Sequence, residues 1–349
     1  MFRKQVAVLL SVFLFIGNAL ARPEVRYRIT PLPGLEIVDL NDKGEVLLQR
    51  FDGERQRAYL WRAGELIELT DRIDPNSTQV RPAGLNDKGA IVGQIGVSGF
   101  LLLKDSVLPI DLGTRVVDPI DINDRGQILG TTDFPEHPGE ENFLLKGTKV
   151  TVLDPLPGGF GTFAIALNDR GAITGESLAT DSVRAVIWER DSVMEIITPR
   201  PAFTAFGIDI NNRNQVVGGF DGQDGSHEYF FWSDGDMTLL ESVSADRPFP
   251  VAVSINDCGD MVGTSLAAAT PPAEWTATIW RNTVPLDLNS LVSDADPSKP
   301  FVKLIEAFRI NNTGQIVALG IDSRKQEQSP YLLTPLHARG HKGISKCHR

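Results

Sequence analysis

The sequence is poor in cysteine, because its 349 residues include only Cys258 and Cys347. Two cysteines are too few for a small domain held together by several disulfides, and a chain of this length can bury a sizeable core without them. The two cysteines have two possible states. One is a single Cys258–Cys347 bridge, which an oxidising compartment would permit, and the other is two unpaired thiols.

Long apolar segments are also scarce. The clearest run covers residues 6–16, follows Arg3 and Lys4, and is followed by the small residues of Ala19-Leu20-Ala21. This order is typical of a secretory signal peptide, and the run is too short to span a bilayer comfortably. We predict a signal peptide over residues 1–21. The mature protein would begin at Arg22, be secreted or periplasmic, and have no membrane contact after cleavage.

Basic residues are in the minority, with 34 Lys and Arg against 45 Asp and Glu. The predicted signal peptide contains two of the basic residues and none of the acidic ones, so the mature net charge is −13. Nucleic acids and anionic membranes repel such a surface. The charge balance therefore argues against a nucleic-acid partner and is typical of a solvated exported protein.

Familiar catalytic motifs are missing as well. The chain has no Gly-x-Ser-x-Gly, His-Glu-x-x-His or Cys-x-x-Cys sequence and no phosphate-binding loop. The glycine-rich stretch at 158–161 lacks both the lysine and the following helix of a phosphate loop, so it indicates a turn. We predict no cofactor, no metal site and no assigned catalytic residue.

What the chain does contain is a repeated motif, which reads Asp-Ile-Asn-Asp-Arg-Gly-Gln-Ile-Leu-Gly at residues 121–130. Each copy has an apolar residue, Asn, then Asp or Asn, any residue, and usually Gly. A period near forty residues indicates a repeat architecture. The anchoring asparagines are Asn41, Asn86, Asn123, Asn168, Asn211, Asn256 and Asn311.

The motif predicts a tight hairpin. Asn is favoured at the start of a type I turn, because its side chain can accept a backbone N–H two residues on, and the glycine supplies a left-handed conformation. One copy has Asn214 in place of glycine, and Asn tolerates positive φ best among the other residues. A calcium loop is the alternative. Because the first motif position varies from Asp39 to Ala166 and Arg309, we favour the turn.

Each repeat also contains four short apolar runs, shown best by Phe206–Ile210, Gln215–Phe220, Tyr229–Trp232 and Met237–Leu240. Runs of this length with turns between them favour strands, and no long window keeps a helical period. We therefore predict an all-β fold, a seven-bladed β-propeller of four-stranded blades over residues 22–336. The third run ends in a tryptophan in four copies, which we assign to the core: Trp61, Trp188, Trp232 and Trp280.

The two ends of the predicted propeller complement one another. The seventh repeat lacks a fourth strand, whereas residues 25–31 form a strand that belongs to no preceding repeat. Pairing the two would close the ring and remove an open sheet edge. The basic segment 337–349 has no strand pattern, and we predict that it is a disordered tail.

These segments resemble the HAF-repeat family of predicted extracellular bacterial proteins. The resemblance lies in the Ile-Asn-Asp-x-Gly-x-Ile/Val-x-Gly segments, the Phe/Ile-x-Trp strands, and phrases such as Asp111-Leu112-Gly113-Thr114. The His-Ala-Phe tripeptide that names the family is absent, with Arg57-Ala58-Tyr59 in its place. The resemblance covers nearly the whole mature chain and implies export and a repeat scaffold, but no particular activity.

Strand order divides the connections between two faces. Connections from first to second and from third to fourth strands are short, and we call their side the turn face, which we expect to be flat and structural. The remaining connections are longer and more variable, and their side, the long-loop face, is the expected binding face. Its candidate ligand-binding residues are Asp133, His137, Glu140, Glu141, Asp221, Asp224, His227, Glu228, Glu274 and Trp275.

The function that the sequence favours is a non-catalytic binding or scaffold module, with a glycan or a protein outside the cytoplasm as its partner. One alternative is a carbohydrate-active hydrolase or lyase on the same face, since paired carboxylates can perform acid–base chemistry on a sugar. Another is a purely structural envelope component, which would have no pocket on either face.

Overall fold

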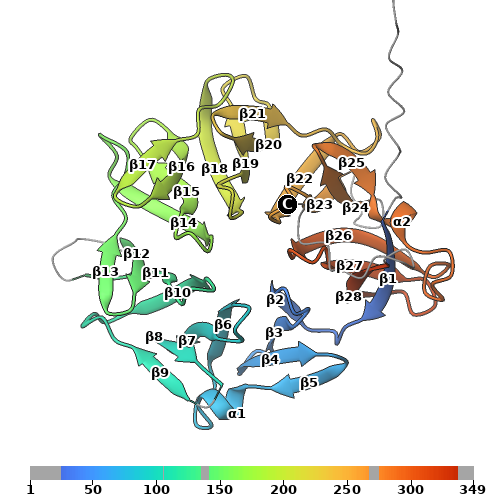
Figure 1. Cartoon of the computed structure of the whole chain (residues 1–349), viewed down its shortest axis with the longest axis horizontal. Coiled ribbons are helices and arrows are strands. Elements are labelled where there is room, and N and C mark those ends of the chain that lie inside the picture. Colours follow the sequence, from blue (N-terminus) through green and yellow to red (C-terminus); the bar gives the residue numbers. More distant parts are fainter. Residues whose placement is uncertain (1–24, 105, 135–140, 267–274, 337–349) are drawn as a thin grey trace, which may run out of the picture.

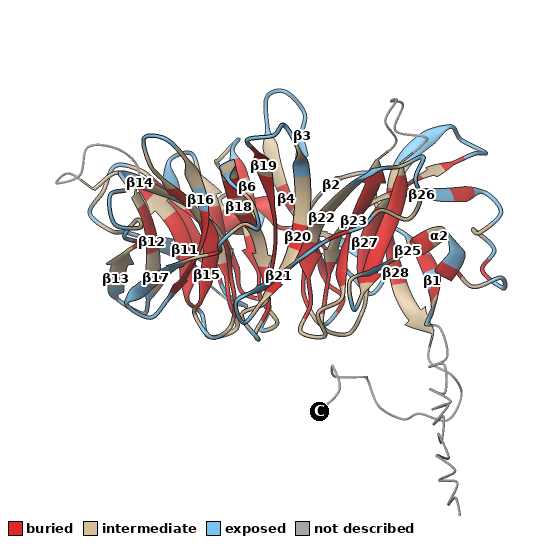
Figure 2. Ribbon diagram, turned by 90° about the horizontal axis from the view of Figure 1, so that it is seen from above, coloured by how far each residue is buried: buried red, intermediate tan, exposed pale blue. Residues whose placement is uncertain are grey.

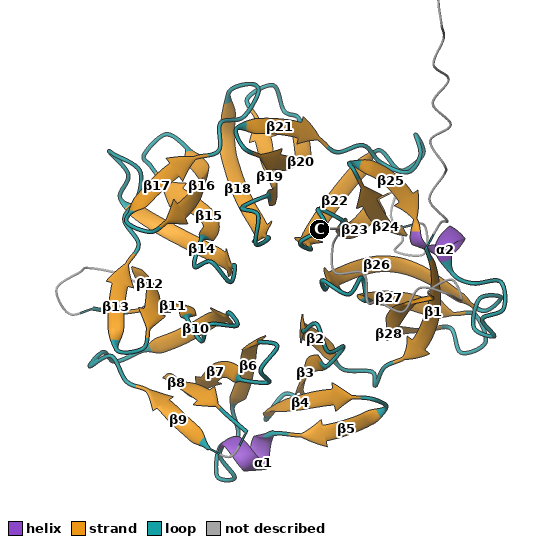
Figure 3. Cartoon of the chain, in the orientation of Figure 1, coloured by secondary structure: helices purple, strands orange, loops and turns teal. Residues whose placement is uncertain are grey.

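The computed structural model of the chain describes residues 25–104, 106–134, 141–266 and 275–336. Strands dominate these residues, and the helices among them are two single turns, α1 (Thr70–Ile73) and α2 (Leu288–Leu291) (Figure 3). The expectation of an all-β fold is confirmed. Neither helix is long and apolar enough to cross a membrane. The predicted signal peptide and basic tail lie outside the described residues.

The strands form groups of four antiparallel strands, here called units, which lie around a central axis (Figure 1). Units 1 to 3 are separate sheets. Unit 1 contains β2 (Glu36–Leu40), β3 (Val46–Phe51), β4 (Gln56–Arg62) and β5 (Glu65–Glu68). Unit 2 contains β6 (Val80–Leu85), β7 (Ile91–Ile95), β8 (Ser98–Leu102) and β9 (Val107–Ile110). Unit 3 contains β10 (Val117–Ile122), β11 (Ile128–Thr132), β12 (Glu141–Lys146) and β13 (Lys149–Val152).

Units 4 and 5 share one larger sheet, because a single parallel pair, Val183 and Thr204, connects them. Unit 4 contains β14 (Gly161–Leu167), β15 (Ile173–Leu178), β16 (Val183–Glu189) and β17 (Ser192–Glu195). Unit 5 contains β18 (Ala202–Ile210), β19 (Val216–Gly222), β20 (His227–Ser233) and β21 (Asp236–Leu239). Unit 6 contains β22 (Phe249–Ile255), β23 (Met261–Leu266), β24 (Thr276–Arg281) and β25 (Val284–Asp287).

Unit 7 is built from both ends of the described chain. It contains β26 (Val302–Ile310), β27 (Ile316–Asp322), β28 (Glu327–Leu336) and, as its fourth strand, β1 (Arg26–Pro31). Strand β1 runs antiparallel to β28, with Arg26 opposite Leu336 and Pro31 opposite Tyr331. The N-terminal strand thus covers the edge that β28 would otherwise leave open. Among the described residues no sheet closes on itself.

The first strand of every unit carries a β-bulge shortly before its turn. In unit 3, for example, the register shifts between Pro119 and Asp121. Equivalent shifts occur in the first strands of the other units. A bulge bends a strand and re-aims the side chains after it. The repeated bulge therefore sets the direction of the residues next to the axis, and no sequence pattern predicted it.

The core lies between neighbouring units, with buried residues in the strands and exposed residues in the connections (Figure 2). All four tryptophans at the ends of third strands are buried, as expected. Trp188 and Trp280 donate their indole N–H groups to the carbonyls of Asp154 and Glu241, each at 2.7 Å. These buried rings therefore also have their N–H groups hydrogen-bonded. The bonds hold the connections that run from the fourth strand of one unit to the first strand of the next.

Candidate functional site

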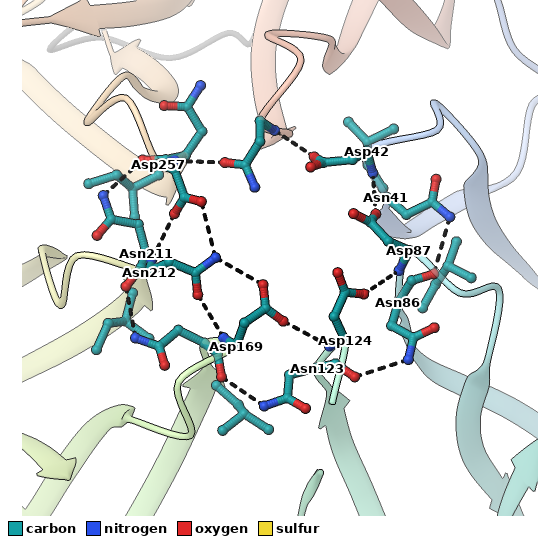
Figure 4. Close-up of a pocket in the computed structure, with 18 of the residues that line it drawn as sticks. Asn41, Asp42, Asn86, Asp87, Asn123, Asp124, Asp169, Asn211, Asn212 and Asp257 are labelled. Carbon is teal, nitrogen blue, oxygen red and sulfur yellow. Dashed lines mark hydrogen bonds between the residues drawn. The ribbon is translucent and has the colours of Figure 1, made fainter. Parts of the chain in front are cut away.

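The seven asparagines of the motif form a ring around the axis (Figure 4 labels several of them). Asn41 donates its side-chain N–H to the carbonyl of Asn86 at 3.2 Å, and Asn311 donates to the carbonyl of Asn41 at 2.8 Å. The other five asparagines repeat this bond to the next unit. Each unit is thereby joined to its neighbour, and unit 7 is joined to unit 1.

The same asparagines also form the predicted turn. In the first copy, Asn41 Oδ1 accepts the backbone N–H groups of Lys43 and Glu45 at 3.1 and 3.0 Å. Gly44 has a φ of 75°, and Asn214, the exception in sequence, has a φ of 59°. The expected turn with a left-handed fourth residue is therefore confirmed. The sequence revealed this local role of Asn but not its bond to the next unit.

A second ring comes from the residue after each asparagine. The backbone N–H of Asp42 donates to Asp87 Oδ1 at 2.7 Å, and that of Asn312 donates to Asp42 Oδ1 at 2.7 Å. The remaining five bonds follow the same order around the axis. Both Asp and Asn carry the required Oδ1 acceptor, which explains why only these two residue types occupy the position. The presence of Asp or Asn at this position in every copy was the feature of the sequence that could have predicted the ring.

The turns surround a hollow of about 170 Å³, so the expectation of a flat turn face is wrong. Seven short turns that converge on one axis leave this space between them. Carboxylates line it, and burial raises the pKa of Asp42, Asp87 and Asp124, with a further contribution from neighbouring carboxylates. No three His, Cys, Asp or Glu side chains within the described ranges are grouped to hold a metal ion.

Neighbouring units are also connected by three buried aspartates, Asp39, Asp121 and Asp209. Asp121 Oδ1 accepts the N–H of Ile122 at 2.7 Å, and its Oδ2 accepts the N–H of Leu167 in the next unit at 3.0 Å. Asp39 and Asp209 make the same pair of bonds. We call these carboxylates backbone caps, because each accepts N–H groups from two units. This role differs from that of the metal ligands in the calcium alternative.

Burial governs the protonation of these caps. It raises the pKa of Asp39, Asp121 and Asp209, and in Asp121 the value reaches about 7. Arg309 partly opposes the effect on Asp39, whose Oδ1 lies 3.8 Å from its Nε. Asp39 and Asp209 raise the pKa of Asp121 further. Asp121 is therefore partly protonated near neutral pH.

On the long-loop face, the predicted residues around 221–228 do come together. His227 Nδ1 bonds to Asp221 Oδ1, and Asp224 Oδ1 accepts the Ser226 hydroxyl at 2.6 Å. Asp221 and His227 are about half exposed. This part of the prediction identified real neighbours, although their side chains are bonded to each other.

Arg200 completes this cluster and was missed in the sequence. Its guanidinium donates to Glu228 Oε1, and its Nε lies 3.7 Å from Asp224 Oδ2. The same guanidinium lies 5.6 Å from the centre of the Phe220 ring. Arg200 comes from the connection between β17 and β18, so only the pairing of whole strands brings it to the loop after β19. The second oxygen of Glu228 is buried and has no hydrogen-bond donor in the described part of the chain.

The other predicted site residues are dispersed. Asp133 accepts the N–H of Val116 at 2.7 Å and is paired with Arg115 at 2.9 Å, and these bonds lower its pKa. Glu141 begins β12. The indole N–H of Trp275 is buried without an acceptor among the residues described. His137, Glu140 and Glu274 lie outside the described residues.

Cys258 lies in the turn of unit 6, where its backbone N–H donates to Asn256 Oδ1 at 2.9 Å. Its thiol is not free. The expected partner, Cys347, lies outside the described residues, so the pairing of the two stays a prediction.

Exposed phenylalanines mark the long-loop face. Among the described residues, six phenylalanines are more than a third exposed, and all lie in long connections or at the strand ends beside them. Phe160 at 71% and Phe203 at 57% are examples. The six are Phe51, Phe160, Phe163, Phe203, Phe249 and Phe301. Such side chains are costly to leave in water, so their restriction to one face is informative.

No protein-family model and no curated protein sequence matches the chain. Among solved structures, it is similar to the β-propeller domain of the trilobed protease from Pyrococcus furiosus, which has an open velcro topology. The TM-score is 0.54 at 10% identity, over 88% of this chain and 99% of that one. Virginiamycin B lyase from Staphylococcus aureus gives a TM-score of 0.52 at 12% identity, over 90% of this chain and 100% of that one.

A third similar structure is a puromycin-hydrolysing peptidase from Mycobacterium tuberculosis. Its TM-score is 0.52 at 10% identity, over 85% of this chain and 53% of that chain. At these identities the likeness defines the fold alone. The chain is therefore a β-propeller module, and the resemblance to HAF repeats stays a prediction.

Proposed function

We propose that this chain is an exported, non-catalytic binding or scaffold module of the HAF-repeat type. In this proposal it is a single seven-bladed propeller domain, with each unit as a blade and β1 completing the last one. The bonds from Asn311 to Asn41 and from Asn312 to Asp42 support closure, because they continue both hydrogen-bond rings from unit 7 to unit 1. The partner is a glycan or a protein outside the cytoplasm.

The observation that carries the proposal is the restriction of exposed phenylalanines to the long-loop face. Phe163, Phe203 and Phe249 lie in the first three residues of the first strands of three consecutive units, and each of these strands contacts the next. Apolar side chains exposed together on a rim of polar residues are typical of an interaction surface. A purely structural role would leave these exposed rings without an explanation.

The turn face is less suited to recognition, because its polar groups already serve the molecule itself. In the first copy, Asn41 bonds both within its turn and to the next unit, and Asp42 accepts the N–H of Asn312. A ligand that used these groups would break contacts between units. This cost favours recognition at the opposite face.

The alternative, a carbohydrate-active enzyme, needs one carboxyl group that donates a proton and a second that is ionised. The Asp221, Asp224 and Glu228 carboxylates are each bonded to His227, Ser226 or Arg200. The hydrogen bonds from Ser226 lower the pKa of Asp224, which suits a fixed acceptor better than an acid catalyst. The cluster therefore supports binding more than turnover.

The proposal is tested by screening the mature chain against a glycan array and a displayed-peptide library. The same screen is run with a Phe163→Ser, Phe203→Ser double variant and with Leu108→Ser, a control on the outer strand β9 that is 44% exposed. We expect ligands that the control retains and the double variant loses. Turnover of a selected ligand that disappears in Glu228→Gln would instead establish the enzyme alternative.

A further inference from the structure

The negative charge of the chain is concentrated in three consecutive units. Residues 161–287, which form units 4 to 6, contain 18 Asp and Glu but only seven Arg and no Lys. Their net charge of −11 equals that of the whole chain, so the remaining residues are balanced. The same three units carry exposed phenylalanines at the starts of their first strands. An apolar surface and a strong field of one sign therefore coincide.

On the long-loop face, one carboxylate lies between the phenylalanines of units 4 and 5. Glu176 in β15 is directly opposite Phe163 in β14, and residues paired in this way project from the same face of a sheet. Ala185, opposite Glu176 on its other side, is buried in a core cluster with Phe220 of unit 5. Glu176 therefore lies on the side of unit 4 that faces unit 5, whose first strand carries Phe203 near its start.

A second carboxylate lies between units 5 and 6. Asp221 in β19 is opposite His227 in β20 and is about half exposed. Two residues earlier in β19, Gly219 pairs with Tyr229, which packs against a core cluster shared with unit 6. Side chains two residues apart in a strand project from the same face. Asp221 therefore points toward unit 6, where Phe249 is 44% exposed.

Basic side chains do not neutralise these two acids. Within the described ranges Glu176 has no hydrogen bond or ion pair, and burial alone raises its pKa. Asp221 is bonded to an imidazole, which is charged only when it is protonated. Asp181, in the connection after β15, accepts the Ser182 hydroxyl at 3.2 Å and has no basic partner in the described structure. Negative charge on this surface is therefore uncompensated.

The arginines on the long-loop face of units 4 to 6 are already occupied. Each has at least one carboxylate partner among the described residues, and one arginine is shared by two carboxylates. The pairs are Arg184 with Glu195 at 3.2 Å, Arg247 with Asp246 at 2.8 Å, and Arg200 with both Glu228 and Asp224. No free cation is left on this part of the face to attract an anionic partner or to balance the remaining acids.

We infer that the long-loop face of units 4 to 6 binds a basic, partly apolar protein segment. Lysine or arginine side chains of the partner would lie between the phenylalanine rings, with their charges on Glu176 and Asp221. Apolar side chains of the partner would cover Phe163 and Phe203. A cation that meets both an aromatic ring and a carboxylate gains from each, whereas an anionic glycan would be repelled. The inference rests on the proposed function, since it names the partner class of the same surface.

The test is fluorescence anisotropy of labelled short peptides titrated with the whole mature chain. One peptide alternates leucine with lysine, and the other alternates leucine with glutamate. We expect only the lysine peptide to bind, and to bind more weakly as the salt concentration is raised. Its affinity should fall about three- to fivefold in Glu176→Gln and in Asp221→Asn, because each change removes one charge and keeps the shape.

Two further variants separate this surface from general attraction to an acidic chain. Binding should be lost in the Phe163→Ser, Phe203→Ser variant. Asp236→Asn is the matched control, since Asp236 is an exposed acid in the same unit at the end next to the turn face, and it should bind as the parent does. Variants are compared only after their circular dichroism spectra match that of the parent.

Equal binding of the two peptides, or parent affinity in both Glu176→Gln and Asp221→Asn, would overturn the inference. So would an all-lysine peptide that binds as tightly as the leucine–lysine peptide, because the phenylalanines would then contribute nothing. If neither peptide binds but another ligand is lost in the Phe163→Ser, Phe203→Ser variant, the inference fails and the proposed function stands. If nothing binds to this face, both fail.

Discussion

Asn312 donates its backbone N–H to the carboxylate of Asp42, 270 residues earlier in the chain, at 2.7 Å. The bond is the same in kind as the six between successive units, for example that from Asp42 to Asp87. First and last units are thus joined at the axis by the motif itself, while β1 pairs with β28 at the periphery of unit 7.

This bond predicts opposite outcomes for two substitutions of one residue. Asp42→Ala removes the acceptor for Asn312 and should lower the free energy of unfolding by about 1–2 kcal/mol. Asp42→Asn keeps an acceptor oxygen, as the natural Asn212 does toward Asp169, and also removes a charge from a crowded ring. Its stability should equal or exceed that of the parent. Urea unfolding measures both, and equal losses in the two variants would argue against the ring.

The buried caps predict that stability falls as pH rises from 5 to 8. The pKa of Asp121 is raised from 3.8 to about 7, so the folded chain holds a proton over a range in which the unfolded chain has released it. Stabilisation from that proton is complete below about pH 4 and is lost as pH passes through about 7, since each pKa unit corresponds to about 1.4 kcal/mol. Burial shifts the pKa values of Asp39 and Asp209 in the same direction.

The measurement is the thermal midpoint at pH 5 and at pH 8. The parent should melt several degrees higher at pH 5. Asp121→Asn should be less stable overall, because it loses one of two acceptor oxygens, but its midpoint should change less between the two pH values. A midpoint that rises from pH 5 to pH 8 in the parent would contradict the assignment.

Tight contact between strands predicts a strong effect at Gly175 in β15. A Cβ atom there would lie 2.1 Å from the carbonyl oxygen of Phe163, so the backbone of β14 would have to move. Gly175→Ala should cost roughly 1–3 kcal/mol in urea unfolding. Gly161→Ala, where the nearest atom is Leu178 Cδ1 at 3.6 Å, is the control and should be close to neutral. Similar losses at both positions would show that the effect is not steric.

The Cys258 thiol is not free, and we predict that its disulfide partner is Cys347. Non-reducing peptide mapping should recover the two cysteine peptides as one linked species, which reduction separates. Cys258→Ser would then lower stability by up to about 2–4 kcal/mol. Recovery of both peptides as free thiols from protein purified without a reductant would refute the bridge.

Local features were predictable from the sequence because each depends on a few consecutive residues. Asn and Gly in the motif predicted the turn, and the surplus strand at residues 25–31 predicted the partner of β28. Contacts between units were not predictable in the same way. The Asp121 cap on Leu167 and the meeting of Arg200 with Glu228 depend on how neighbouring units are aligned, which no local pattern specifies. The same limit explains the wrong expectation of a flat turn face.

The most direct test of the closed ring is amide hydrogen exchange at the turns. A backbone N–H in a surface turn ordinarily exchanges quickly, but here the N–H of Asn312 is bonded to Asp42 and that of Asp42 to Asp87. We predict slow exchange at both positions, with Asn312 as well protected as the equivalent residues of other units. Fast exchange at Asn312 alone, with protection retained at Asp42 and Asp87, would mean that units 7 and 1 are not joined and would contradict the closed propeller.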